Sequence, residues 1–128
     1  MPFSRLTLYP APDEQTSTNL ASALTGLIER ILSKKAPLTS VLVETPAAVR
    51  WTLGSEPLAS TAVLEVNVTE STNSEADKAA FIAAAHATLC DHVPDLNDVC
   101  YVIIREIPAS AWGYDGMTQA QRSAMSTG

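Results

Sequence analysis

The order strand, helix, strand occurs twice in this chain, at an offset of about 60 residues, and this internal repeat constrains the fold more than any other feature. In the first copy, residues 2–9 alternate between apolar and polar, an amphipathic segment follows, and residues 37–44 form a second strand-like run. The second copy repeats this order, with strands expected over 62–69 and 99–106. Because a helical crossover normally returns a strand parallel to the one before it, the repeat predicts two right-handed β-α-β units. We therefore expect an α/β (α+β) fold, with a four-stranded mixed sheet and two helices on one face.

The first expected helix has one apolar stripe, because its large aliphatic residues recur at spacings of three and four. These residues are Leu20, Leu24, Leu27, Ile28 and Ile31. Thr16 or Ser17 is expected to cap the open N–H groups at the start of this helix. Lys34 and Lys35 follow the helix, at the end where its dipole favours cations.

The second expected helix begins at Ser74, which has Asp77 three residues later and so resembles a capping box with a shorter acid. Its buried stripe is expected to contain Phe81, Ile82, Ala85 and Leu89. The two helices are thus predicted to pack against the sheet through one face each.

Composition agrees with one compact domain, since 46% of the 128 residues are apolar. The domain is expected to cover 1–118, with repeats at about 2–58 and 62–118, and residues 119–128 are expected to form a flexible tail. No run approaches the roughly 18 apolar residues of a membrane span, and the amino terminus lacks the pattern of a secretory signal, so a cytoplasmic location without a membrane partner is the default expectation. The net charge of −6 argues against nucleic acid as a partner, because no basic stripe is present to neutralise phosphates.

The cysteines and histidines give no sign of a cofactor or metal site. Cys90 and Cys100 are too few for a disulfide framework and lie in elements that are expected to bury them as small apolar residues. His86 and His92 have no ligand partners at a suitable spacing, and we expect both to be surface or half-buried residues of the second helix. No glycine motif for nucleotide binding occurs either, so the sequence predicts neither a cofactor nor a metal.

Pro2 is the residue with the clearest potential for chemistry. If Met1 is removed, the nitrogen of Pro2 becomes a secondary amine that can take a proton, give a proton or attack a carbonyl. An unperturbed α-amino group titrates at about 7.7–8.0, and burial lowers that value because it disfavours the cation. A base near working pH is the most efficient kind of general acid–base catalyst.

Taken together, these features resemble the tautomerase superfamily. The resemblance rests on the Pro2 start, the two β-α-β units, the segment 37–41, and the run 103–108 that leads to 112–116. It covers nearly the whole chain, from Pro2 to about Gly116. Its nearest form is the fused group, in which two copies of a 4-oxalocrotonate tautomerase unit lie in one chain. That group includes relatives of cis-3-chloroacrylic acid dehalogenase and malonate semialdehyde decarboxylase.

The resemblance implies a homotrimer of fused chains with a proline at the floor of each pocket. Pro2 would shuttle a proton between the carbon and the oxygen of a small enol, such as a 2-hydroxydienoate or an arylenolpyruvate. The second copy starts at Ala62, inside the chain, so each chain would carry one catalytic proline.

The sequence departs from the family where relatives use arginines to hold substrate carboxylates. The matching places hold Pro12, residues 70–73, Leu42 and, subject to the alignment, Tyr101. A carboxylate clamp would have to come from Arg5, Arg50 or Arg105. Arg105 is the best of these because it shares a strand face with Tyr101, although a solvated or intersubunit ion pair is its more ordinary role.

Three other positions are candidates for shaping the pocket. Trp112 falls where the family has an aromatic wall, and packing at a trimer interface is the alternative. Tyr114 lies near the place of a water-activating glutamate in the dehalogenase relatives; a tyrosine hydroxyl is a poor base but can donate to an enolate oxygen. Asn73 could orient a substrate carbonyl or simply serve a turn, and Glu106 is expected to be structural.

Two classes of function remain open from the sequence. The first is an isomerase, a proline-dependent keto–enol tautomerase with substrate-binding residues Tyr101, Trp112, Arg105, Asn73 and Tyr114. Within the enzyme class, a cofactor-free dehalogenase, hydratase or decarboxylase of a small three-carbon acid is the alternative. The second class is an inactive trimeric scaffold, which the missing arginines and a retained Met1 would favour.

Overall fold

The computed structural model describes residues 2–127, with side chains through Met125. The expectations that concern Met1, including its removal, lie outside the described residues, as does Gly128 of the expected tail.

The two repeats fold as two strand–helix–strand units. The first consists of β1 (Phe3–Tyr9), α1 (Glu14–Leu32) and β2 (Ser40–Glu44), with a short 3-10 helix η1 (Ala36–Leu38) before β2. The second consists of β5 (Thr61–Thr69), α2 (Glu75–His92) and β6 (Tyr101–Ile107). Two small hairpins complete the chain, namely β3 (Thr52–Leu53) with β4 (Glu56–Pro57), and β7 (Gly113–Tyr114) with β8 (Met117–Thr118); helix α3 (Gln119–Thr127) follows.

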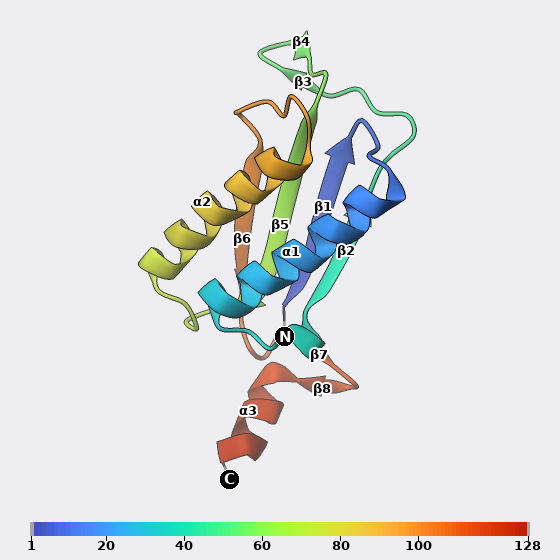
Figure 1. The fold of residues 1–128 in the computed structure, drawn as a ribbon. Coiled ribbons are helices and arrows are strands. Elements are labelled where there is room, and N and C mark those ends of the chain that lie inside the picture. The colour runs from blue at the N-terminus through green and yellow to red at the C-terminus, as the bar shows by residue number, and fades with distance from the viewer. Residues whose placement is uncertain (1, 128) are drawn as a thin grey trace.

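The main sheet has the order β2-β1-β5-β6, and α1 and α2 lie side by side over one of its faces (Figure 1). Strands within each repeat are parallel, since β1 pairs with β2 and β5 pairs with β6 in that sense. The two repeats join through an antiparallel pairing of β1 with β5. The predicted four-stranded mixed sheet with two helices on one face is therefore confirmed.

The ends of two strands differ from the prediction. Strand β2 starts at Ser40 rather than Pro37, because Pro37 has no N–H for a sheet ladder and instead lies in the first turn of η1. Strand β6 starts at Tyr101 rather than Val99, whose N–H donates to Asn97 Oδ1 over 2.8 Å in a local turn.

The core lies between the sheet and the two helices. Alternate residues of β1 and β5 point into it, and they are Ser4, Leu6, Leu8, Ala62, Leu64, Val66 and Val68. The helices supply Leu20, Leu24, Leu27, Ile28, Leu32, Phe81, Ala85 and Leu89. The other face of the sheet, which no helix within the described residues covers, carries mostly half-exposed and exposed side chains. We call it the open sheet face; it includes Phe3, Leu42, Tyr101, Ile103 and Arg105.

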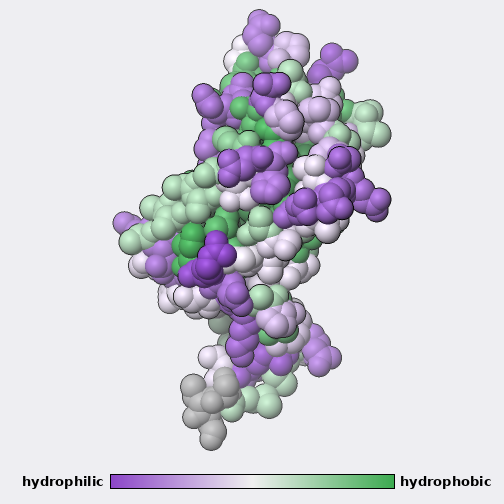
Figure 2. All heavy atoms as spheres, viewed as in Figure 1, coloured by the Kyte–Doolittle hydropathy of each residue, from purple (hydrophilic) through white to green (hydrophobic). Residues whose placement is uncertain are grey.

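Helix α2 is less amphipathic than its predicted stripe implied. Ile82 was expected inside, but 40% of it is exposed, because it lies one position away from the buried row that Phe81, Ala85 and Leu89 form. The outer surface of α2 is rich in exposed alanines such as Ala79, and it is pale green in Figure 2.

The helix caps are confirmed for α2 and corrected for α1. Ser74 and Asp77 form the predicted capping box: the Ser74 hydroxyl accepts from Asp77 N over 3.0 Å, and Asp77 Oδ2 accepts from Ser74 N over 3.1 Å. Helix α1 begins earlier than expected, and Asp13, not Thr16 or Ser17, is its N-cap. Asp13 Oδ1 accepts from Thr16 N over 2.7 Å, and this hydrogen bonding lowers the pKa of the Asp13 carboxyl.

Replacing Ser74 by Ala is expected to lower the free energy of unfolding by about 1 kcal/mol, because the N–H of Asp77 loses its capping acceptor. Urea denaturation of the purified protein measures this change. Ser17→Ala is the matched control, since Ser17 lies inside α1 rather than at its cap, and it should change stability by less than about 0.5 kcal/mol. Equal losses in the two variants would contradict this assignment of the caps.

The carboxy-terminal segment forms α3 over Gln119–Thr127, where the sequence led us to expect an irregular, flexible tail. The helix follows directly on β8, and Thr118 and Gln121 exchange two hydrogen bonds of 3.0 Å across its start. No helix in the described part of the chain is long and apolar enough to cross a membrane.

Candidate active site

Pro2 is buried at one end of the sheet, directly before β1. Its carbonyl oxygen accepts a hydrogen bond from Ser40 N over 3.1 Å, which ties it to the first residue of β2. The start of β1 lies close to η1 in Figure 1, in agreement with the bond between Pro2 and Ser40. The same end of the sheet receives the carboxy ends of β5 and β6, because Thr69 pairs with Ile107 beyond the row in which Phe3 pairs with Asn67.

The structure brings Trp112 to this end of the sheet. Its indole Nε1 donates to Thr69 Oγ1 over 3.1 Å, and the side chain is half-buried. A shallow pocket of about 280 Å³ is lined by Trp112 and the β7–β8 hairpin. Trp112 is therefore held in one orientation at the carboxy end of β5.

Local backbone geometry explains the run from Gly113 to Gly116. A Cβ at Gly113 would overlap the backbone of Met117 on the facing strand, so only glycine fits there. Asp115 and Gly116 both have positive φ, 52° and 74°, as a two-residue type I′ hairpin turn requires. The hairpin thus turns the chain back at Asp115 and Gly116, and Tyr114 is the last residue of its first strand.

Tyr114 lines a second pocket at this end, with a volume of about 370 Å³. Its ring stacks under Arg122 of α3, whose guanidinium carbon lies 3.8 Å from the ring centroid, and Arg122 Nη2 donates to the carbonyl of Tyr114 over 2.9 Å. The pocket also contains Lys34, Lys35 and Leu38. Leu38, which lines this pocket, is two residues before Ser40, whose N–H donates to the carbonyl of Pro2.

This second pocket, which we call the cationic pocket, collects three of the eight Lys and Arg residues of an acidic chain. Lys34 Nζ donates to Thr72 Oγ1 over 2.8 Å. Burial lowers the pKa of the Lys34 ammonium, while the Asp77 carboxylate acts in the opposite direction. Three cations and a tyrosine around one cavity form a suitable environment for a small anion.

Sequence reasoning missed the three cations of this pocket. Lys34 and Lys35 were interpreted as cations at the end of a helix, and Arg122 was assigned to a flexible tail. Their position after the first helix was a usable signal for the lysines, but the contact between α3 and Tyr114 depends on tertiary structure.

Asn73 lies at the same end, in a supporting position. Its Nδ2 donates to the carbonyl of Leu32 over 2.9 Å and lies 3.5 Å from Asp77 Oδ2. These bonds join the end of α1 to the start of α2, so the Asn73 amide holds the segment that contains Lys34 against the start of α2. Glu106 is bonded to Lys78 over 2.8 Å, which lowers the pKa of its carboxyl.

Tyr101 and Arg105 lie on the open sheet face, and Tyr101 is far from Pro2 in the same chain. Tyr101 pairs with Val63, which pairs with Thr7, five residues along β1 from Pro2 or roughly 17 Å. Tyr101 is 64% exposed. Arg105 is nearer the proline end, and its Nη2 lies 3.8 Å from Glu65 Oε1.

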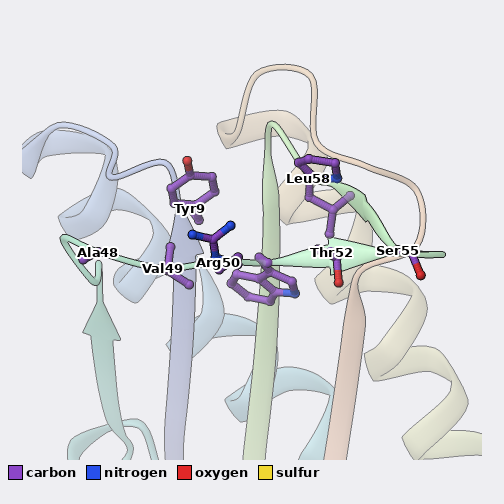
Figure 3. A pocket seen from close by; sticks show the side chains of 9 residues that line it. Tyr9, Ala48, Val49, Arg50, Thr52, Ser55 and Leu58 are labelled. Carbon is purple, nitrogen blue, oxygen red and sulfur yellow. The ribbon is translucent and has the colours of Figure 1, made fainter.

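The other arginines considered as a carboxylate clamp are placed elsewhere. Arg5 Nε lies 3.4 Å from Glu44 Oε1 on the open sheet face. Arg50 and Tyr9 line a pocket of about 720 Å³ at the opposite end of the sheet, formed mainly by the segment around β3 and β4 (Figure 3). This pocket is larger than the cationic pocket, but Arg50 is the one candidate from the sequence analysis that lines it. Among residues 2–127, no group of three or more His, Cys, Asp or Glu is arranged to hold a metal ion.

No protein-family model and no curated protein matches the sequence, whereas many solved structures match the fold. A fused 4-OT described as a wild-type symmetric trimer is 17% identical, with a TM-score of 0.84 over 94% of this chain and 98% of its own. A macrophage migration inhibitory factor-like protein from Entamoeba histolytica is 16% identical, with a TM-score of 0.77 over 91% and 97%. A member of the cis-3-chloroacrylic acid dehalogenase family is 17% identical, with a TM-score of 0.78 over 91% and 82%. The expected tautomerase/MIF-like fold is thus confirmed.

Proposed function

We propose that this chain, which has the tautomerase fold, is an isomerase that interconverts the keto and enol forms of a small 2-oxo acid with Pro2 as its general base. The observation that carries the proposal is the meeting of a buried Pro2, Trp112 and the cationic pocket at one end of the sheet. In a chain of net charge −6, this concentration of positive charge favours an anionic substrate.

The roles of the residues follow from their chemistry. The free amine of Pro2 takes the proton of the enol hydroxyl and delivers a proton to carbon, and burial helps to keep that amine neutral. The cationic pocket holds the substrate carboxylate in place of the absent family arginines. The Tyr114 hydroxyl donates to the developing enolate oxygen, and Trp112 supplies an apolar wall.

Spectrophotometric ketonisation of phenylenolpyruvate, with one carboxylate, and of 2-hydroxymuconate, with two, tests this function. We expect turnover of both substrates. Phenylenolpyruvate should be preferred, because each proline has one cationic pocket to bind a carboxylate. Release of chloride from cis-3-chloroacrylate without ketonisation of either enol would instead indicate a dehalogenase. Absence of all three reactions in protein that starts at Pro2 would leave hydration, decarboxylation or a binding or scaffold role.

A homotrimer is part of the proposal. The open sheet face leaves Phe3, Leu42, Tyr101 and Ile103 between 36% and 64% exposed, which suits burial against other chains. The fused 4-OT structure with the same fold is described as a trimer. In such an assembly Tyr101 and Arg105 would serve the pocket of a neighbouring chain, because Tyr101 cannot reach Pro2 of its own.

Ile103→Asp is expected to convert the protein from a species three times the 13.6 kDa chain mass to a monomer, because it places a charge in the buried interface. Light scattering after size exclusion measures the change. Ile82→Asp is the matched control: Ile82 is similarly exposed, at 40% against 36%, but lies on the outer surface of α2. Loss of the trimer in the control, or its persistence in Ile103→Asp, would contradict the proposed interface.

A further inference from the structure

A histidine and two thiols form a cluster outside the proposed active site. His86 and Cys90 are one turn apart on α2 and so share a face of the helix. Cys90 Sγ lies 3.5 Å from His86 Nε2, and Cys100 Sγ, directly before β6, lies 3.5 Å from His86 Nδ1. Both nitrogens of one imidazole therefore face a sulfur.

The two thiols differ in their access to solvent. The sequence led us to expect both to be buried, but Cys90 is exposed and Cys100 is half-buried, and neither is in a disulfide. Cys90 is exposed because it lies one position beyond Leu89 in the buried row of α2. The cluster is at the start of β6, at the opposite end of the sheet from Pro2.

Metal binding does not explain this arrangement. The two ring nitrogens of His86 point in different directions. An ion bound to Nε2 would face Cys90 and an ion bound to Nδ1 would face Cys100, so the ring and both sulfurs cannot bind one ion together. In the described part of the chain no metal-holding group occurs. A thiol beside an imidazole can pass its proton to the ring, which makes the sulfur a better nucleophile.

We propose that Cys90 is a nucleophilic thiol, with His86 as its base and Cys100 as the group that orients the ring, and that it adds to neutral α,β-unsaturated carbonyl compounds. The arrangement is that of a nucleophile and a base within hydrogen-bonding reach, with the base positioned by a third side chain. The inference is independent of the tautomerase proposal.

A neutral imidazole can serve as the base for only one of the two thiols, and exposure distinguishes them. A neutral imidazole has one N–H donor and one acceptor nitrogen, so it can accept from only one of the two thiols. Cys90 is exposed and can meet a reagent, whereas Cys100 is half-buried, and burial raises the pKa of its thiol. The proposal therefore assigns the acceptor nitrogen Nε2 to Cys90 and the donor Nδ1–H to Cys100 Sγ.

The surrounding charge selects a neutral electrophile. The negative end of the α2 dipole is close by, Asp91 follows Cys90 in the chain, and Asp98 precedes β6 near Cys100. These groups repel an anionic electrophile that approaches Cys90. A neutral enone or enal meets no such repulsion.

The reaction is an addition and needs no oxidant or reductant. A bond forms between Cys90 Sγ and the β-carbon while the carbon–carbon π bond breaks. The thiol proton passes to His86 Nε2 and from there to the α-carbon, so charge and atoms balance.

N-ethylmaleimide, a neutral Michael acceptor, tests the inference on the full chain at pH 7 with peptide mass mapping of the adducts. We expect Cys90 to be modified first, and His86→Ala to slow its modification by about tenfold or more. Added imidazole should restore part of the rate in His86→Ala. His92→Gln is the matched control and should leave the rate unchanged, because His92 is on the same helix but bonds to the carbonyl of Thr88.

Three results would overturn the inference. The first is modification of Cys100 before Cys90, and the second is an unchanged rate of Cys90 modification in His86→Ala. The third is a slower modification of Cys90 in His86→Ala that added imidazole does not restore. A carboxylate-bearing maleimide should react more slowly at Cys90 than N-ethylmaleimide does, after correction for their rates with glutathione; an equal corrected rate would contradict the role of the acidic surroundings. His86→Gln is a second variant without the imidazole. If it keeps the circular dichroism of the parent and also slows the modification of Cys90, a folding defect does not explain the result for His86→Ala.

Discussion

Pro2→Ala is expected to lower kcat/KM for phenylenolpyruvate by about 10²- to 10⁴-fold, the range that general acid–base catalysis supplies. Alanine leaves a primary amine at the same place, but it lacks the ring that fixes the direction of the nitrogen lone pair. A small change in the placement of a catalytic group costs much of its effect. Steady-state ketonisation, followed by the loss of enol absorbance, measures the change.

A folding defect must be separated from this loss. Pro2 is buried, and its carbonyl accepts from Ser40 N, a bond that the backbone keeps when alanine replaces the proline. The variant should therefore retain its circular dichroism and its oligomeric mass. Turnover within about twofold of the parent would show that the proline ring is not needed, and it would leave the α-amine of residue 2, Tyr114 and Lys34 as the bases to consider.

Loss of the cationic pocket is expected to have the next largest effect on activity. Lys35→Gln and Arg122→Gln should each raise KM for phenylenolpyruvate by roughly 10- to 100-fold, because a hydrogen bond to a charged group contributes about 1.5–3 kcal/mol. The effect on kcat should be small, since the carboxylate is held equally in the ground state and the transition state. Initial rates over a range of substrate concentrations separate the two constants.

Two variants are needed because Arg122 also stacks on Tyr114, whereas Lys35 does not share that contact. Arg30→Gln is the control for removal of a positive charge, since Arg30 is in the last turn of α1 and outside the pocket. A rise of KM in Arg30→Gln equal to that in Lys35→Gln would point to long-range charge rather than to a binding site. Unchanged KM in both pocket variants would show that the substrate carboxylate binds elsewhere.

The sequence predicted the sheet because its pattern is local and repeated. Alternation in β1 and β5 and helical spacing between them specify two β-α-β units, and the resemblance to the tautomerase superfamily agreed with them. The sequence-based prediction was wrong where a shift of one to four residues changes the role of a side chain. Ile82 is apolar but lies one position outside the buried row of α2, and Asp13 precedes the residues that were expected to cap α1.

The candidate site was harder to predict because it depends on contacts distant in sequence. Trp112 meets Thr69 across 43 residues, and the two lysines meet Tyr114 and Arg122 only after the β7–β8 hairpin turns the chain back. Tyr101 shows the opposite case: its family position suggested the pocket, yet pairing with Val63 places it far from the proline of its own chain. A sequence pattern does not specify whether a side chain contributes to the pocket of its own chain or to that of a neighbouring chain.

The central claim is that the free amine of Pro2 is the base, and a single added residue tests it most directly. One protein should start at Pro2, and a second should keep one additional residue before Pro2, with both masses verified. The added residue turns the proline nitrogen into an amide without basicity and leaves every side chain of the cationic pocket in place. We expect ketonisation of phenylenolpyruvate by the first protein and its loss in the second. Equal turnover by the two proteins would contradict it.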